Sequence, residues 1–222
     1  MFLDVARICE YHKPKVIFCE NVKGLVSHDK GRTFKIIKET FEEIGYKVFY
    51  EILNSKDFGV PQNRERIYIV AFRNDIAPDN FVFPEGFDSN KTIRDILDPV
   101  KTTNKYYISE KYLNSLKKHK ENSLAKGNGY GYLTHSFDDI FQTIVCGGMG
   151  RERNLIIDER DGFISSNSEN IRMATPREFF RAQGFPEPFI LPHKKTELYR
   201  QAGNTVTILV VQAIAKEIKK YL

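Results

Sequence analysis

The sequence predicts an α/β protein whose sheet is mostly parallel. Over roughly the first 75 residues, apolar segments at helical spacing alternate with short runs rich in β-branched and aromatic residues. No strand and no GxGxxG turn precede the first helix, although open α/β sheets bind cofactors at loops after their early strands. The last fifty or so residues return to helical patterns. Together these observations predict part of an α/β sheet.

The first part of the chain supplies the predicted sheet. The spacing of apolar residues over Phe2–Cys9 predicts a helix, which should end near Pro14 because the residue before a proline disfavours the α conformation. A second helix is expected to end at Gly45. The ranges are a helix over 32–44 and strands over 15–19, 46–53 and 66–72.

A polar segment rich in proline and glycine, 74–90, reads as a linker to a middle region. After it we expect helices over 91–97 and 106–120 and a strand over 140–145. Thr175, Pro176 and Glu178 form a helix start with a capping residue, a proline at the first position and an acid after it. That helix should close on Gly184, and a last long helix is expected over 205–221.

Composition narrows the class of protein. The 222 residues are 41% hydrophobic and 28% charged, with a net charge of +5, which is typical of a globular intracellular protein. No apolar stretch is long enough to span a membrane, and Asp4 stands where a signal peptide would be basic. The three cysteines form no CxxC pattern, so neither a disulfide scaffold nor a metal site is expected. The positive charge permits binding to nucleic acid.

Glu20 follows the first predicted strand, within the run Cys19-Glu20-Asn21-Val22. A carboxylate there would lie at the carboxyl edge of the sheet, where α/β enzymes place catalytic groups. Alternatively, Glu20 only caps the turn that follows.

Arg64 and Arg66 lie two residues apart at the start of a predicted strand, which places them on one face with Glu65 opposite. Paired guanidinium groups suit a phosphate or a carbonyl acceptor. The alternative is a solvated strand end with surface ion pairs.

A glycine-rich loop over 146–150 is followed by Arg151 and Arg153. Such a loop lets the backbone approach a DNA groove, and arginines read guanine edges or hold phosphates. An ordinary hairpin loop remains an alternative.

Gly203-Asn204-Thr205 is expected to open the last helix, so its N–H groups would be available to an anion or to a cofactor carboxylate. A plain helix start is the alternative. Cys19 and Cys146 have no neighbouring His or Lys in sequence, which favours buried structural cysteines over nucleophiles.

Taken in order, these segments resemble the DNA cytosine-5 methyltransferase family. Glu20-Asn21-Val22 resembles its ENV motif, and Gln62–Arg66 resembles its QxRxR motif. Thr143-Ile144 is similar to the signature of the target-recognition domain. Arg172–Pro186 resembles the family's TPRE segment, and Gln201–Val206 resembles its closing GNSV motif with Thr205 in place of serine. The resemblance covers essentially the whole chain.

The resemblance implies a catalytic role for three residues on a cytosine flipped out of the duplex. Glu20 would hydrogen-bond N3 and the exocyclic amine, Arg66 would hold the O2 carbonyl, and Arg64 would order the site. A cysteine thiolate would add to carbon 6, carbon 5 would then take the methyl group of S-adenosylmethionine, and a base would remove the carbon 5 proton.

The resemblance also implies a cofactor pocket, closed by Asn204, Thr205 and Val206, and a DNA surface. Thr143 would touch the DNA backbone, and the loop Cys146–Arg153 would read bases. The residues assigned to that loop's DNA contacts are Gly147, Gly148, Arg151 and Arg153.

Two motifs of the family are missing from this sequence: the glycine-rich cofactor loop and the Pro-Cys-Gln loop with the nucleophile. Neither Cys19 nor Cys146 stands where that nucleophile belongs. The expected domains are a partial catalytic domain over 1–74, a target-recognition domain over 75–171 and C-terminal helices over 172–222. Half of a Rossmann-like methyltransferase sheet plus a smaller mixed α/β domain is therefore the expected fold.

These features predict the C-terminal portion of a sequence-specific cytosine-5 methyltransferase, cytoplasmic and associated with the nucleoid of a prokaryote. It would be inactive alone and would bind double-stranded DNA and an N-terminal subunit or segment that carries the cysteine. The partner is expected to cover the sheet edge and the apolar face of the Phe2–Cys9 helix. A non-catalytic DNA-binding module or relic, and an expressed fragment of a longer chain, are the alternatives.

Overall fold

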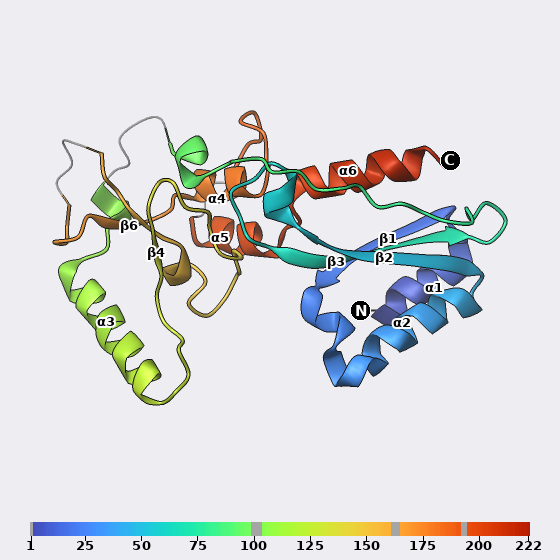
Figure 1. Ribbon diagram of the computed structural model, residues 1–222, viewed down its shortest axis with the longest axis horizontal. Helices are drawn as coiled ribbons and strands as arrows, with labels where there is room; N and C mark the ends of the chain where they lie inside the picture. Colours follow the sequence, from blue (N-terminus) through green and yellow to red (C-terminus); the bar gives the residue numbers. More distant parts are fainter. Residues whose placement is uncertain (1, 99–103, 161–164, 192–194) are drawn as a thin grey trace. The chain divides into compact units, whose positions relative to one another are not determined.

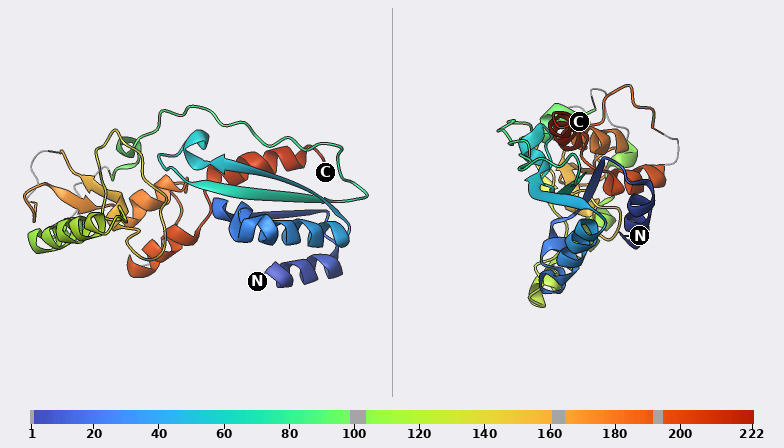
Figure 2. Two further views of the ribbon diagram at one scale, coloured as in Figure 1. Left: turned by 60° about the horizontal axis from the view of Figure 1, so that its bottom comes forward. Right: turned by 90° about the vertical axis from the view of Figure 1, so that its right-hand side faces the viewer.

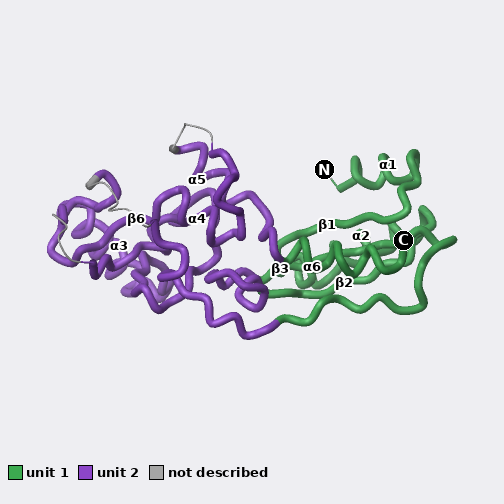
Figure 3. The backbone as a smooth tube through the Cα atoms, turned by 90° about the horizontal axis from the view of Figure 1, so that it is seen from above, with its two compact units in different colours: residues 1–54, 65–86, 210–222 green, residues 55–64, 87–209 purple. Residues whose placement is uncertain are grey.

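The computed structural model describes residues 2–98, 104–160, 165–191 and 195–222, and the chain divides into two compact units (Figure 3). Unit 1 comprises Met1–Asn54, Glu65–Gly86 and Val210–Leu222. Unit 2 comprises Ser55–Arg64 and Phe87–Leu209. This division follows compactness alone, so the assignment of functions to the ranges 1–74, 75–171 and 172–222 remains a prediction.

Unit 1 contains a three-stranded sheet in the order β1-β3-β2, and β3 is antiparallel to both neighbours. Its strands are β1 (Val16–Val22), β2 (Tyr46–Asn54) and β3 (Glu65–Arg73). The expectation of a mostly parallel sheet is therefore wrong for these strands. Only the ten residues Ser55–Arg64 connect β2 to β3, with a short 3-10 turn among them, and parallel strands need a longer crossover.

Two helices cover one face of this sheet, as expected from their apolar spacing. They are α1 (Phe2–His12) and α2 (Arg32–Glu43), and α6 (Ile208–Lys219) extends along the other face (Figures 1 and 2). The Phe2 ring packs edge-on against Phe41 at 5.4 Å between centroids. The expectation that the apolar face of the first helix is uncovered is thus wrong in part: Ala6 and Cys9 are buried and Phe2 packs on α2, whereas Ile8 is exposed.

The edge of the sheet at β1 is open. β1 pairs with β3 along one side, and no strand of the described residues pairs with its other side. This part of the expectation agrees with the structure, and it leaves backbone groups available to a further strand.

Unit 2 is built around a small mixed sheet, β4-β5-β6, with β4 parallel to β5 and β6 antiparallel to it. Leu113 and Leu116 of α3 pack with Leu155 and Ile171 of this sheet. A second hydrophobic core contains Phe141 together with residues of the C-terminal helices, among them Phe179. The elements are α3 (Glu110–Ala125), β4 (Thr134–His135), β5 (Leu155–Ile157), β6 (Ile171–Met173), α4 (Pro176–Ala182) and α5 (Lys195–Asn204).

The capping signals predicted for α4 are confirmed. Thr175 Oγ1 accepts from the Glu178 amide at 3.2 Å, and the Thr175 amide donates to Glu178 Oε2 at 2.7 Å. Gly184 follows the helix with a φ of 81°, a conformation that glycine adopts without strain. The short helix expected over 91–97 is a 3-10 turn at Ile93–Ile96.

The strand expected over 140–145 does not form. Its backbone groups bond to a single neighbouring loop, since the Phe141 amide donates to the Pro61 carbonyl and the Ile144 amide to Gln62 Oε1. Side chains and one isolated β-bridge, between Gln62 and Phe141, thus satisfy the backbone hydrogen-bonding groups of this segment, in place of the expected pairing with a neighbouring strand.

The last helix begins later than expected. Gly203 and Asn204 form the end of α5, and the Ile208 amide, at the start of α6, donates to the Gln183 carbonyl. None of the helices in the described ranges combines the length and apolar character that crossing a membrane requires.

Candidate functional site

Glu20 and Arg66 meet on the face of the unit 1 sheet opposite to α1 and α2. Glu20 is opposite Tyr68 in the register, and Arg66 is opposite Val22, so the two are diagonal neighbours on adjacent strands. Arg66 Nε lies 3.1 Å from Glu20 Oε1. Both side chains are largely buried, with 11% of Arg66 and 22% of Glu20 exposed.

This ion pair is incomplete. Glu20 Oε1 is buried, and it accepts no hydrogen bond of good geometry from any described residue. Arg66 Nη1 donates to the Glu65 carbonyl at 2.8 Å. Burial lowers the pKa of the Arg66 guanidinium, and the Glu20 carboxylate opposes that shift. A carboxylate and a guanidinium that are held together without saturating each other can both serve a ligand.

Glu20 does not cap the turn after β1, so that alternative is wrong. The strand continues through Val22, which places Glu20 inside it. Asn21 Oδ1 accepts from the Val22 amide, and Lys23 pairs with Glu65 at 2.9 Å. The local turn is therefore satisfied by other residues.

Arg64 lies in unit 2 and links two segments of backbone. Its Nη1 donates to the Ile144 carbonyl at 3.0 Å, and its Nη2 donates to the Thr205 carbonyl at 2.9 Å. Over the whole residue, Arg64 is 4% exposed and Arg66 is 9% exposed. Both are buried, so the alternative of a solvated strand end is wrong. Arg64 therefore positions the loops on either side of it.

Gln62 has a similar role that the sequence did not reveal. The side chain is fully buried, its Nε2 donates to the Ala182 carbonyl at 2.9 Å, and its Oε1 accepts from the Ile144 amide at 3.0 Å. The position of Gln62 within the Gln62–Arg66 motif is the sequence signal that could have indicated this positioning role.

The recognition loop, defined as residues 146–153, leaves the core beside Thr143. The Thr143 hydroxyl donates to the Asn63 carbonyl at 2.9 Å, so this side chain holds the base of the loop. Gly147 and Gly148 are exposed. The loop does not close a hairpin, because β4 and β5 pair in parallel.

Both arginines of this region rest on aromatic rings. Arg151 is exposed and lies over Tyr199 at 5.5 Å, and Arg153 is half-buried and lies over Tyr130 at 5.0 Å. Arg153 also donates to the Gly131 carbonyl. Arg151 is therefore the more accessible of the two.

The cysteines differ in their surroundings. Cys9 is buried and Cys19 half-buried, and burial raises the pKa of both thiols. Cys146 is exposed in the recognition loop, so the expectation of a buried structural cysteine is wrong there. A thiol with a raised pKa is a poor nucleophile, which argues against Cys9 and Cys19 in that role.

The residues predicted for a cofactor pocket do not open a helix. Asn204 ends α5, and the Thr205 amide donates to the Gln201 carbonyl at 3.0 Å. The expectation of free N–H groups at a helix start is wrong here. The Asn204 side chain is exposed, whereas Thr205 and Val206 are half-buried.

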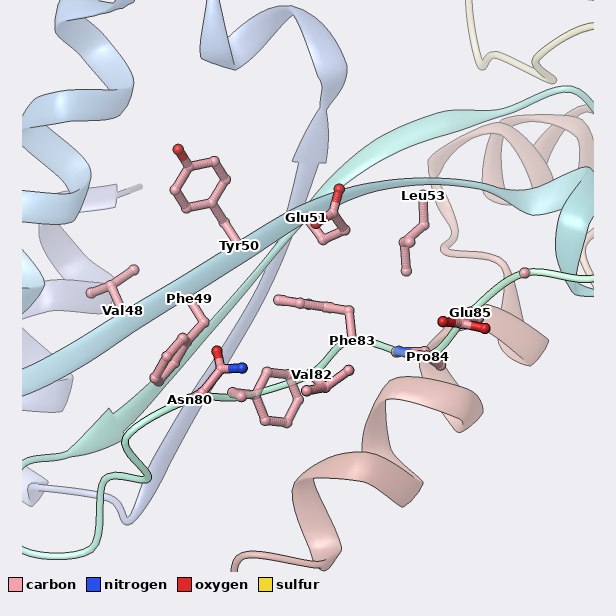
Figure 4. A pocket seen from close by; sticks show the side chains of 12 residues that line it. Val48, Phe49, Tyr50, Glu51, Leu53, Asn80, Val82, Phe83, Pro84 and Glu85 are labelled. Atoms are coloured by element: carbon pink, nitrogen blue, oxygen red, sulfur yellow. The ribbon is translucent and has the colours of Figure 1, made fainter.

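A separate cavity of about 650 Å³ lies in unit 1 between β2 and the segment 80–86 (Figure 4). Phe49, Phe83 and Glu51 are among the side chains that line it. None of the residues predicted for catalysis lines this cavity, so it is distinct from the Glu20–Arg66 pair.

Comparison with known proteins identifies the family. The model of the C-5 cytosine-specific DNA methylase family matches residues 1–220. The chain belongs to this family.

Two relatives are type II methyltransferases. M.HpaII of Haemophilus parainfluenzae is 47% identical, with the alignment covering 100% of this chain and 65% of the relative. M.SsoII of Shigella sonnei is 41% identical over 98% of this chain and 56% of the relative. The chain therefore spans less than two thirds of the length of these curated methylases.

The fold agrees with this family. A solved methyltransferase of Entamoeba histolytica, EhMeth, superimposes with a TM-score of 0.72 at 21% identity, over 93% of this chain and 63% of that one. The likeness supports the mixed α/β fold of the cytosine-5 methylases.

Proposed function

We propose that this chain supplies the base-binding and DNA-recognition parts of a sequence-specific DNA cytosine-5 methyltransferase of the restriction-modification type. The observation that carries the proposal is the Glu20–Arg66 pair, with a buried carboxylate oxygen whose hydrogen-bonding capacity the described residues leave unused. The enzyme would act on double-stranded DNA in the cytoplasm of a bacterium, since the type II methyltransferases that it resembles are bacterial.

In the proposed reaction the pair binds the hydrogen-bonding edge of a flipped cytosine. The Glu20 carboxyl group, when it carries a proton, donates to N3 and accepts from the exocyclic amine, and the Arg66 guanidinium donates to the O2 carbonyl. These contacts stabilise the charge that develops on the ring when a thiolate adds to carbon 6. The incomplete pairing between the two side chains leaves acceptor and donor capacity for the base.

S-adenosylmethionine supplies the methyl group when it is bound. The exposed amide of Asn204 suits a polar group of this cofactor, and Thr205 and Val206 are half-buried beside it. Arg64 holds the Thr205 carbonyl and so fixes the position of this segment. These residues fit one wall of a pocket, and other residues of the complete enzyme are needed for the rest.

The nucleophile would come from residues outside this sequence, in a separate subunit or in another part of the same polypeptide. Cys9 and Cys19 have thiols whose pKa is raised by burial, and Cys146 lies in the recognition loop of unit 2. The open edge of β1 would accept a strand of that missing part.

The decisive experiment measures transfer of a tritiated methyl group from S-adenosylmethionine to duplex DNA. We expect no transfer with the chain alone, and transfer when it is co-purified with a polypeptide that supplies the cysteine loop and the glycine-rich cofactor loop of the family. Robust activity of the isolated chain would overturn the proposal. DNA binding without methyl transfer in either preparation would instead identify a non-catalytic recognition module.

A matched pair of variants tests the role of Glu20 in the active complex. Glu20→Gln should lower kcat/KM by about 100-fold or more, because an amide has no acidic proton to give to N3 of the ring as a carboxyl group does. Glu51→Gln makes the same chemical change at an exposed position of β2 and should leave the rate within about twofold. Equal effects of the two variants would remove Glu20 from the site.

A further inference from the structure

The GNTV segment, which the family resemblance links to the cofactor, also contacts the recognition loop. A Cβ placed on Gly203 would lie 2.3 Å from the Cys146 amide nitrogen and 2.4 Å from the Val145 carbonyl carbon. Only glycine allows α5 and the loop to approach so closely. The base of the recognition loop therefore rests directly on α5.

The contact at Gly203 shows which side of α5 lies against the recognition loop. Thr196, Tyr199, Arg200 and Gly203 are spaced i, i+3, i+4 and i+7, which places them on one side of the helix. Leu198 and Ala202, between them in sequence, belong to the buried core, and Tyr199 belongs to it as well. Tyr199 therefore joins the side of the helix that meets the loop to the core that anchors the helix.

This face and the recognition loop enclose a cavity of about 240 Å³. Gly147, Gly148 and Arg151 line it from the loop, and Thr196, Tyr199 and Arg200 line it from α5. Arg151 is held over the Tyr199 ring at 5.5 Å, while the Tyr199 hydroxyl donates to the Ala174 carbonyl. The position of Arg151 is therefore fixed by a ring that is itself anchored.

The cavity is positively charged. Two guanidinium groups and the hydroxyl-bearing residues Thr196 and Tyr199 line it, and no carboxylate is among the described residues that do so. The nearby Glu197 pairs with Arg200 at 2.5 Å, but this is a surface pair, with 61% of Arg200 and 36% of Glu197 exposed. Such pairs exchange readily for a phosphate, because water screens their attraction.

We propose that Arg200 and Thr196 of α5, together with Arg151, form a site for one backbone phosphate of duplex DNA. The inference rests on the proposed function, and it adds α5 to the DNA-binding surface. The site lies at the base of the loop beside Gly203, away from the exposed tip at Gly147 and Gly148. That position suits the phosphates that flank a groove, while the tip enters the groove.

The test is equilibrium binding of the full chain to a fluorescein-labelled duplex oligonucleotide over a range of salt concentrations. Arg200→Gln should weaken binding about fivefold to tenfold at moderate salt and should reduce the slope of log Kd against log salt by about one. The loss should be equal for duplexes of different sequence, because phosphates carry no sequence information. Lys216→Gln removes one charge from an exposed position of α6 and should change neither quantity.

Coupling between the arginines sharpens the test. If Arg151 and Arg200 share one phosphate, the double variant should lose less than the product of the two single losses. Thermal unfolding should show that Arg200→Gln folds normally, since its side chain is mostly exposed.

The outcomes separate the two proposals. Unchanged affinity and salt slope in Arg200→Gln, with the unaltered chain binding DNA, would overturn the phosphate site and leave the proposed function standing. A loss confined to one base pair of the target would also overturn it, since it would indicate a base contact. Failure of the unaltered chain to bind any duplex at low salt would overturn both.

Discussion

Two buried arginines, one in each unit, show opposite degrees of hydrogen bonding. Arg172 on β6 is fully buried, and its guanidinium bonds to Asp158 at 2.6 Å and to both oxygens of Glu178 at 2.8 and 2.9 Å. Arg66 on β3 has one carboxylate neighbour, at 3.1 Å, and that oxygen accepts no well-formed hydrogen bond. The first guanidinium is saturated by the fold, and the second is not.

The difference teaches how to tell a structural ion pair from a binding pair. A buried charge that the fold satisfies on every side stabilises one arrangement of β5, β6 and α4, since removing a partner leaves an uncompensated charge. A pair with open positions gains its remaining partners only when a ligand binds. The same residue type therefore has different functions because of the number of bonds that the fold supplies.

The largest effect on stability is expected from the saturated arginine. Arg172→Met should lower the free energy of unfolding by about 3–5 kcal/mol, because Glu178 would remain buried without its counter-charge and Asp158 would keep only Arg160. Urea denaturation followed by circular dichroism measures the change. As a control, Arg32→Met removes an exposed partner of Asp29 and should cost less than about 1 kcal/mol. Similar losses in the two variants would contradict the distinction.

Arg64 tests an intermediate case. It is buried, and it donates to the Ile144 and Thr205 carbonyls. Arg64→Met should cost about 2–3 kcal/mol in the same measurement, since two carbonyls lose a donor but no carboxylate is left unpaired by those bonds. A loss as large as that of Arg172→Met would place Arg64 in the saturated class.

The saturated cluster also predicts an acid-sensitive part of the stability. Burial alone would raise the pKa of Asp158, but hydrogen bonds from Arg160 and Arg172 outweigh it and hold the pKa below its usual 3.8. A carboxyl with a lower pKa in the folded state stabilises that state above its unfolded pKa, and this contribution is lost as the pH falls through the folded value. The difference in unfolding free energy between the unaltered chain and Asp158→Asn should therefore be constant from neutral pH to about pH 5 and shrink below about pH 4. A difference that grows in acid would contradict this sign.

Local sequence signals predicted the parts of the fold that depend on neighbours in the chain. The capping residues Thr175 and Glu178 formed the expected helix start, and Gly45 closed the second helix. Glu20 and Arg66 were each predicted as site residues. Their contact was not, because it depends on the register between β1 and β3.

Features that depend on distant segments were missed for a common physical reason. The segment after Phe141 reads as a strand, but Gln62 and Arg64 satisfy its backbone from elsewhere in the chain. Gly203 reads as a helix start, but its missing side chain serves the contact with Cys146. Periodicity carries no information about such partners.

The smallest effect on stability is expected at Glu20, and it completes the comparison. Glu20→Gln should change the free energy of unfolding by less than about 1.5 kcal/mol, because the amide oxygen can still face Arg66 and Glu20 Oε1 has no well-formed hydrogen bond to lose. Glu178→Gln makes the same substitution where both oxygens bond to Arg172, and it should cost about 3 kcal/mol. Urea denaturation of the two variants side by side measures the contrast, with methyl transfer in the assembled enzyme as the second readout. A loss near 3 kcal/mol in Glu20→Gln would mean that its pairing with Arg66 serves the fold, and the assignment of an open binding pair would fail.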